Sequence, residues 1–189
     1  GPHSINANYY GPREIDGKKY PGMQTRMIKT LYQDAIRKTT LVQVDEHFKD
    51  TTEFEISGMK MEYVKVGYAH SEEDWFLYLP EEKVVLVADV VMNGRVTSNR
   101  DGLIIGQLNA LKAIKARDWN HLVAGHGFIT DRTAADESIQ YFTYIKDRVL
   151  EGIEEEIHPD DITKHVTLEE FRNKDLYYLL SPGNVFRAY

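Results

Sequence analysis

Two apolar runs separated by a polar turn make up the segment WFLYLPEEKVVLVAD, residues 75–89. Pro80 opens the turn, and both runs are nearly continuous in apolar residues instead of alternating with polar ones. This pattern is typical of neighbouring strands that are covered on both faces of a sheet. Asp89 directly follows the second run, so its carboxylate must find a cation or several N–H donors once it leaves water.

Strand and helix patterns alternate on both sides of this segment. Residues 53–67 alternate apolar and polar side chains around a Ser-Gly turn, which predicts a hairpin with one wet face. Downstream, residues 101–115 have helical spacing with Asp101 as the N-cap, and residues 121–125 form a short strand. From Thr133 the letters TAAD fit a capping box that opens a long helix. We therefore expect an α/β fold, a layered sandwich with helices packed outside the sheets.

The two ends of the chain have different patterns. Residues 1–24 are rich in Gly, Pro and Asn and predict loops, whereas residues 25–38 have the spacing of an amphipathic helix. After Glu156 the sequence breaks into short polar and apolar pieces that predict two short helices and a tail. The expected organisation is one domain over residues 1–156, with residues 157–189 packed on the same domain as a C-terminal tail.

The amino-acid composition limits the classes of protein to which this chain can belong. The 189 residues are 42% hydrophobic, which is ample for a packed core. The 23 basic and 30 acidic side chains give a net charge of −7, which argues against nucleic acid or an anionic membrane as a partner. Cysteine is absent, which excludes disulfides and thiolate chemistry. No apolar run reaches the ~20 residues of a membrane span, so we expect a soluble protein, cytoplasmic by default, of unknown compartment.

Three polar residues follow predicted strands and could share a site. His70 comes after the hairpin, Asp89 after the second apolar run, and His126 after residues 121–125, between two glycines that let the backbone turn sharply. A single His near a strand end is most often a surface or satisfied core residue. If the three strands are neighbours, however, these side chains emerge at one edge of the sheet, where α/β proteins bind ligands. Two imidazoles and a carboxylate suit Zn, Fe or Mn.

Two segments carry a resemblance to a known family. AHSEEDWFLYLPEEKVVLVADVV (residues 69–91) and DWNHLVAGHG (residues 118–127) resemble the later metal-binding motifs of the metallo-β-lactamase superfamily. The resemblance implies a layered αββα sandwich that lacks its N-terminal strands. It also implies that His70, Asp89 and His126 are metal ligands and that Asp89, a metal-bridging ligand in the family, is catalytic.

The family's first motif, HxHxDH, has no good match. The best candidate is HSINAN, residues 3–8, in which His3 matches and could be a fourth ligand, whereas Ile5, Ala7 and Asn8 replace a His, the Asp and the last His. The Asp is the serious loss, because in family members it ligates metal and orients the nucleophilic water. With four ligands at best, we expect one ion, zinc first with iron or manganese as alternatives, or no ion.

These features leave three functions open. The first is a hydrolase that uses a metal-activated water on a small-molecule ester, thioester, lactone or amide-type substrate. The second is a degenerate, metal-poor relative, a pseudoenzyme that acts as a binding protein. The third is one piece of an assembly, either a homo-oligomer or a chain complemented by a separate N-terminal chain.

Overall fold

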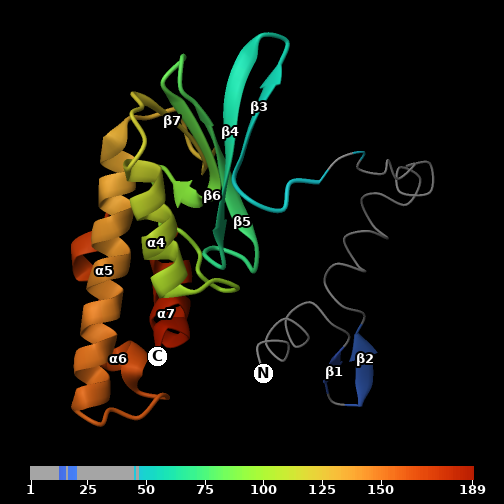
Figure 1. The fold of residues 1–189 in the computed structure, drawn as a ribbon. Coiled ribbons are helices and arrows are strands. Elements are labelled where there is room, and N and C mark those ends of the chain that lie inside the picture. The colour runs from blue at the N-terminus through green and yellow to red at the C-terminus, as the bar shows by residue number, and fades with distance from the viewer. Residues whose placement is uncertain (1–12, 16, 21–44, 46) are drawn as a thin grey trace. The chain divides into compact units, whose positions relative to one another are not determined.

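The computed structural model describes residues 13–15, 17–20, 45 and 47–189, which fall into two compact units that divide after His47 (Figure 1). In the first unit, β1 (Arg13–Ile15) and β2 (Lys18–Tyr20) pair as an antiparallel hairpin. The prediction of loops throughout residues 1–24 is therefore wrong for this hairpin. The predicted helix at residues 25–38 lies outside the described residues, as does His3.

The second unit is built on a mixed five-stranded sheet. Its strands lie in chain order, antiparallel except for the last pair, which is parallel. The elements are β3 (Thr52–Ile56), β4 (Met59–Gly67), β5 (Asp74–Leu79), β6 (Val84–Met92) and β7 (His121–His126). The predicted hairpin and the three later strands are thus confirmed, although β6 continues past Asp89.

Helices follow the strands, as the sequence predicts. They are α4 (Ile104–Lys115), α5 (Arg132–Glu154), α6 (Ile162–His165), the 3-10 turn η1 (Glu169–Phe171) and α7 (Tyr177–Ala188). Both predicted N-caps are wrong. Helix α4 begins after Leu103 without a side-chain cap, and α5 is capped by Asp131, whose carboxylate accepts a hydrogen bond from the Thr133 amide at 2.9 Å. Helix α7 is longer than the short helices expected near the C-terminus.

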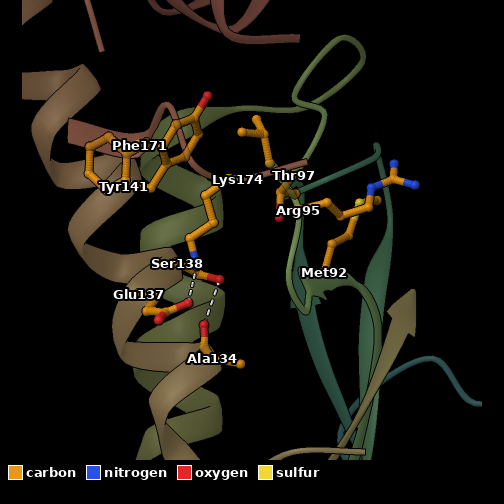
Figure 2. Close-up of a pocket in the computed structure, with 10 residues that line it drawn as sticks. Met92, Arg95, Thr97, Ala134, Glu137, Ser138, Tyr141, Phe171 and Lys174 are labelled. Carbon is orange, nitrogen blue, oxygen red and sulfur yellow. Dashed lines mark hydrogen bonds and ion pairs between the residues drawn. The ribbon is translucent and has the colours of Figure 1, made fainter. Parts of the chain in front are cut away.

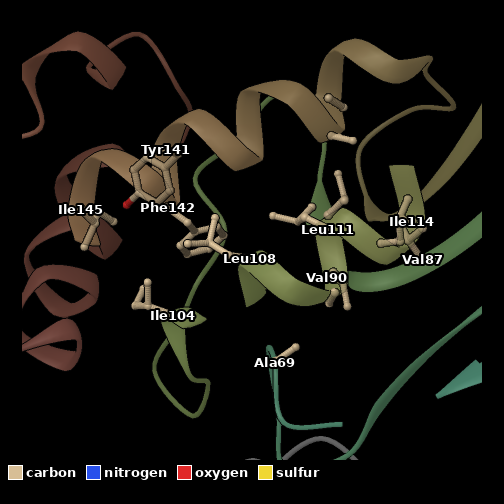
Figure 3. Close-up of a cluster of buried hydrophobic side chains, with 14 of the residues drawn as sticks. Ala69, Val87, Val90, Ile104, Leu108, Leu111, Ile114, Tyr141, Phe142 and Ile145 are labelled. Atoms are coloured by element: carbon tan, nitrogen blue, oxygen red, sulfur yellow. The ribbon is translucent and has the colours of Figure 1, made fainter. Parts of the chain in front are cut away.

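The core lies between one face of the sheet and the helices (Figure 1). Alternate residues of β5, β6 and β7 point toward α4 and α5 and are fully buried, for example Phe76, Val85 and Leu122. Leu111 of α4 and Phe142 of α5 belong to the same core cluster, and both are labelled in Figure 3. Burial of these side chains is the main force that fixes the helices on the sheet, at about 1.5–3 kcal/mol for each large apolar residue.

The opposite face of the sheet departs from the sequence prediction. Trp75 is 44% exposed, and Leu77, Leu79 and Leu86 are only partly buried. Within the described residues, helices cover one face of these strands and not two. The α/β class is confirmed, with one helical layer and one sheet layer of the expected sandwich.

The C-terminal segment packs on α5 of the same unit. Tyr141 of α5 contacts the ring of Phe171 edge-on at 5.0 Å, and Ile162 and Val185 belong to the main core. Division of the chain at residue 156 stays a prediction. None of the helices in the described part of the chain could span a lipid bilayer.

Tyr141 provides a pH-dependent test of this packing. Burial raises the pKa of Tyr141 to about 12, and its hydroxyl accepts a hydrogen bond from the Asn184 amide at 2.8 Å. The unfolded chain loses this proton near pH 10, so the folded state loses relative stability as pH rises from about 10 to 12, by roughly 2–3 kcal/mol in total. Urea denaturation of the wild type and Tyr141→Phe at about pH 9 and 11 measures the difference. Equal losses in both proteins would contradict the prediction.

Candidate functional site

Three strands end at the same edge of the sheet. β6 and β7 are parallel, and β4 runs in the same direction because both β4 and β6 are antiparallel to β5 between them. His70 follows the end of β4, Asp89 lies in the second half of β6, and His126 is the last residue of β7. The topology therefore brings these residues together, as the sequence predicts for neighbouring strands.

The Asp89 carboxylate lies between the two imidazoles. His70 Nε2 is 3.7 Å from Asp89 Oδ2, and His126 Nε2 is 3.6 Å from Asp89 Oδ1. The three side chains are 21%, 44% and 48% exposed, in the order His70, Asp89, His126, so the cluster is open to solvent on one side. The structure thus unites three of the four predicted ligands, while His3 lies outside the described residues.

A strained backbone presents Asp89. Ala88 has a positive φ of 45°, and the pairing of β6 with β7 shifts register at this residue. A non-glycine residue in this region costs about 1–3 kcal/mol, and such strain concentrates at functional sites. The irregularity turns the chain just before Asp89. Nothing in the apolar run that precedes Asp89 predicts this backbone irregularity.

Gly125 is needed because β7 passes very close to Asp89. A Cβ atom at Gly125 would lie 2.1 Å from Asp89 Oδ1 and 2.6 Å from the Ala88 carbonyl carbon. The sequence indicated a close approach of the backbone here, because glycines flank His126 on both sides. Only glycine allows β7 to run beside the carboxylate without displacing it.

Replacement of Gly125 by alanine should therefore displace Asp89 from the two histidines. We expect zinc affinity to fall by about tenfold or more, the scale seen when the support of a metal ligand is lost. Competition with a chelating dye measures the affinity. Gly183→Ala is the control, because a Cβ at Gly183 meets nothing within 4 Å. Equal affinities in the two variants would contradict the role given to Gly125.

The turn after β7 is held by Asn93, a residue that sequence reasoning missed. The Asn93 amide N–H donates to the His126 carbonyl at 2.9 Å, and its side-chain amide donates to the Phe128 carbonyl at 3.1 Å. Gly127 supplies the turn with a φ of 91°. Asn93 thus fixes the backbone on both sides of Gly127 and, with it, the position of His126.

The loop that carries His70 is also fixed by local hydrogen bonds. Ser71 donates to both oxygens of Asp74, from its amide at 2.7 Å and its hydroxyl at 2.8 Å, and the Leu103 amide donates to the Ala69 carbonyl at 2.7 Å. The Nδ1 atom of His70 is buried and has no hydrogen-bond partner within the described residues. The backbone of this loop is therefore anchored, whereas the His70 ring is not held through Nδ1.

The two imidazoles and the carboxylate are groups that zinc commonly binds, but their present arrangement does not enclose an ion. Both His–Asp separations are too long for a hydrogen bond and close to the ~3.4 Å expected between two ligands of one zinc ion with bonds of about 2.1 Å. However, no group of three or more His, Asp or Glu side chains among the described residues is arranged to hold an ion. The two histidines face opposite oxygens of Asp89. The side chains of His70, Asp89 and His126 must therefore turn toward a common centre, or a further ligand must join them, before they can bind an ion.

A separate pocket lies on the helix side, between α5 and the segment after β6 (Figure 2). Its lining includes Thr97, Tyr141 and the ion pair between Lys174 and Glu137. Its volume of about 20 Å³ is enough for about one water molecule. None of the three clustered residues lines it, so this pocket is too small and misplaced to be the substrate site.

Comparison with solved structures places this arrangement in a known fold. The sec-alkylsulfatase Pisa1 from Pseudomonas sp. matches with a TM-score of 0.58 at 18% identity over 75% of this chain and 25% of its own. A double mutant of that sulfatase gives a TM-score of 0.62 at 18% identity over 79% of this chain and 26% of its own. A metallo-β-lactamase from Pontibacter korlensis gives 0.50 at 18% identity over 70% of this chain and 67% of its own.

The chain thus spans about a quarter of the alkylsulfatase's length. The amino-acid sequence itself matches no protein-family model and no curated protein. At 18% identity the structural matches establish the fold and nothing finer. They confirm the fold that the sequence resemblance implies, because one of the matched structures is a metallo-β-lactamase. The chain has a partial metallo-β-lactamase fold.

Proposed function

We propose that this chain is a metal-dependent hydrolase whose ion is held by His70, Asp89 and His126. The observation that carries the proposal is the position of the Asp89 carboxylate, within 3.7 Å of both imidazoles behind a strained Ala88. Strain of this kind persists only where the surrounding structure imposes it. Zinc is the first choice for two imidazoles and a carboxylate, with iron or manganese as alternatives.

Each residue has a distinct role in this proposal. The bound ion supplies Lewis-acid activation of water and of the scissile bond. Asp89 contributes the negative charge of the site and sets the spacing of the two imidazoles. Asn93 positions His126 through the turn, and Gly125 leaves room for the carboxylate. His3 would be a fourth ligand.

The substrate is proposed to be a small molecule with an ester, thioester, lactone or amide-type bond. Two observations support this class: the three clustered side chains are solvent-accessible, and Phe128 and Ile129, just beyond His126, are 89% and 69% exposed. Apolar side chains next to a reactive centre can bind the apolar part of a substrate. Sulfate esters and β-lactams are further substrates to test, because the similar solved structures are an alkylsulfatase and a metallo-β-lactamase.

The test combines metal analysis with a substrate panel. Protein purified without chelator should contain about one equivalent of zinc, iron or manganese, and His126→Ala should lose it. The same preparations are assayed on chromogenic ester, thioester, lactone, sulfate-ester and β-lactam substrates. Metal-dependent hydrolysis that disappears in His126→Ala is the expected result. Metal-free protein with no hydrolysis after zinc is added would refute the proposal.

A second candidate is a non-catalytic binding protein with the same fold. It is favoured by the lack of a metal-holding group among the described residues. In that case the cluster of His70, Asp89 and His126 is a remnant, and the protein binds neither zinc nor iron nor manganese. The metal analysis above separates the two functions without knowledge of the substrate.

A further inference from the structure

An arginine at the end of α7 reaches the loop that carries His70. Arg187 donates from Nε to the Gly102 carbonyl at 3.2 Å and from Nη2 to the Tyr68 hydroxyl at 3.1 Å. Tyr68 precedes His70 by two residues, and Gly102 lies beside the backbone of the same loop. One side chain of α7 therefore holds both the loop and the segment next to it.

A second connection between α7 and this region runs through buried amides. Asn184 of α7 is 2% exposed, and its Oδ1 atom accepts a hydrogen bond from the Asn99 backbone amide at 2.8 Å. Its Nδ2 atom donates to the Thr97 carbonyl at 2.8 Å. The Asn99 carbonyl in turn accepts a hydrogen bond from the Gly102 amide at 3.2 Å. Helix α7 thus fixes the segment of residues 97–102, which ends beside the His70 loop.

The side chain of Asn99 lies where this segment meets the His70 loop. Asn99 is fully buried, yet neither Oδ1 nor Nδ2 has a hydrogen-bond partner among the described residues. A Cβ atom at Gly102 would lie 2.3 Å from Asn99 Oδ1. The same atom would lie 2.4 Å from the Ala69 carbonyl oxygen and 2.9 Å from the His70 carbonyl oxygen. Three acceptor oxygens therefore crowd one small space, which is unfavourable away from water.

A half-turn of the Asn99 carboxamide removes this conflict. The oxygen and nitrogen of the carboxamide have nearly the same shape, so the hydrogen bonds that each can make decide which is which. After the half-turn, Nδ2 is the atom beside the two carbonyl oxygens. The Ala69 carbonyl already accepts a hydrogen bond from the Leu103 amide at 2.7 Å, which leaves the His70 carbonyl as the acceptor for Asn99 Nδ2.

We propose that α7 positions His70 through two residues, Arg187 and Asn99, with Asn99 Nδ2 donating to the His70 carbonyl. This role rests on the proposed function, in which His70 binds the ion. Among the described residues, Nδ1 of His70 has no partner, so the backbone of the loop sets the direction of the ring. The ring faces Asp89 through Nε2. Supporting hydrogen bonds commonly orient metal ligands in this way.

The first test measures zinc affinity in variants of the full chain. Arg187→Met removes both hydrogen bonds, Arg187→Lys keeps the charge but loses the planar pair of donors, and Asn99→Ala removes Nδ2 without adding charge. We expect zinc to bind about tenfold more weakly to Arg187→Met and Asn99→Ala, with partial recovery in Arg187→Lys. Competition with a chelating dye gives the affinities.

Ile145→Val is the control that separates positioning from a general loss of stability. Ile145 is fully buried on α5, outside the loop and the segment that hold His70. Removal of one methylene group from the core destabilises the fold. We expect this variant to bind zinc as tightly as the wild type.

Hydrogen exchange of the metal-free protein provides a readout that does not involve zinc. The Leu103 amide donates to the Ala69 carbonyl and the Ser71 amide to Asp74, so their exchange rates report how firmly the loop is held. We expect both amides to exchange at least about tenfold faster in Arg187→Met and Asn99→Ala, and at nearly the wild-type rate in Ile145→Val.

Two results would overturn the positioning role of α7. One is unchanged exchange in both Arg187→Met and Asn99→Ala, and the other is faster exchange with unchanged zinc affinity. A wild type that binds no zinc would refute the proposed metal site instead. In that case faster exchange in the two variants supports the positioning of His70 by α7, and unchanged exchange refutes it.

Discussion

Replacing Asp89 by asparagine is expected to lower the zinc affinity of this chain by at least about a hundredfold and to abolish any metal-dependent hydrolysis. Loss of residues that merely orient metal ligands costs 10–100-fold, and in the described part of the chain Asp89 is the one carboxylate that lies between the two imidazoles. Asparagine keeps the shape of the side chain and its neutral oxygen but removes the charge. Zinc titration by calorimetry gives the affinity, and the substrate panel gives the activity.

Two controls separate this effect from general damage. Asp147→Asn removes a carboxylate that pairs with Lys146 on the surface of α5 at 2.9 Å and should leave zinc affinity unchanged. The urea stability of metal-free Asp89→Asn should stay within about 0.5 kcal/mol of the wild type, because Asp89 is 44% exposed and exposed ion pairs contribute little. Unchanged zinc affinity in Asp89→Asn would remove Asp89 from the site.

Much of the fold could be predicted because the sequence patterns reflect burial directly. Residues 75–79 and 84–88 are apolar because one side of each strand is buried in the core, as at Phe76 and Val85, while the other side carries partly buried residues such as Leu77. The long helix α5 shows its buried stripe at Phe142, Ile145 and Val149, as its spacing predicts. The convergence of His70, Asp89 and His126 was predicted on the condition that their strands lie close together in the sheet, and the strand order meets this condition.

Other features could not be predicted, either because the local sequence fits more than one register or because the contacts join residues distant in sequence. Helix α5 is capped by Asp131 and not by the capping box predicted from Thr133. The sequence around residues 131–136 is compatible with more than one starting residue for the helix. The positive φ of Ala88 is imposed by the register shift between β6 and β7. The hydrogen bonds of Asn93 to the turn after His126 likewise require β6 and β7 to be adjacent.

The same logic explains why the cluster has only three described members. β4, β6 and β7 run toward this edge and lead to His70, Asp89 and His126, whereas β5 runs the other way and begins at the edge with Asp74, whose carboxylate accepts hydrogen bonds from Ser71. Among the described residues, the strands that run toward this edge therefore bring together His70, Asp89 and His126. A fuller ligand set would draw on residues beyond these three, such as His3, which lies outside the described residues.

The closest approach between helix and sheet edge gives the largest expected loss of stability. Gly106 of α4 rests against the loop after β4, and a Cβ there would lie 1.6 Å from the Tyr68 carbonyl oxygen and 2.8 Å from its carbonyl carbon. Both atoms belong to the backbone, so no side-chain rotation can relieve the clash. The helix and the loop that carries His70 would have to separate.

Gly106→Ala is therefore expected to destabilise the fold by about 3 kcal/mol or more, the range of severe overpacking in a core. The intrinsic helix propensity of alanine favours the substitution by only about 1 kcal/mol, so the clash decides the sign. Gly183→Ala in α7 is the matched control, because its Cβ meets nothing within 4 Å, and there the propensity should stabilise the protein by about 0.5–1 kcal/mol. Urea denaturation followed by circular dichroism measures both changes. If Gly106→Ala also stabilises the protein, α4 does not pack against the Tyr68 carbonyl as described.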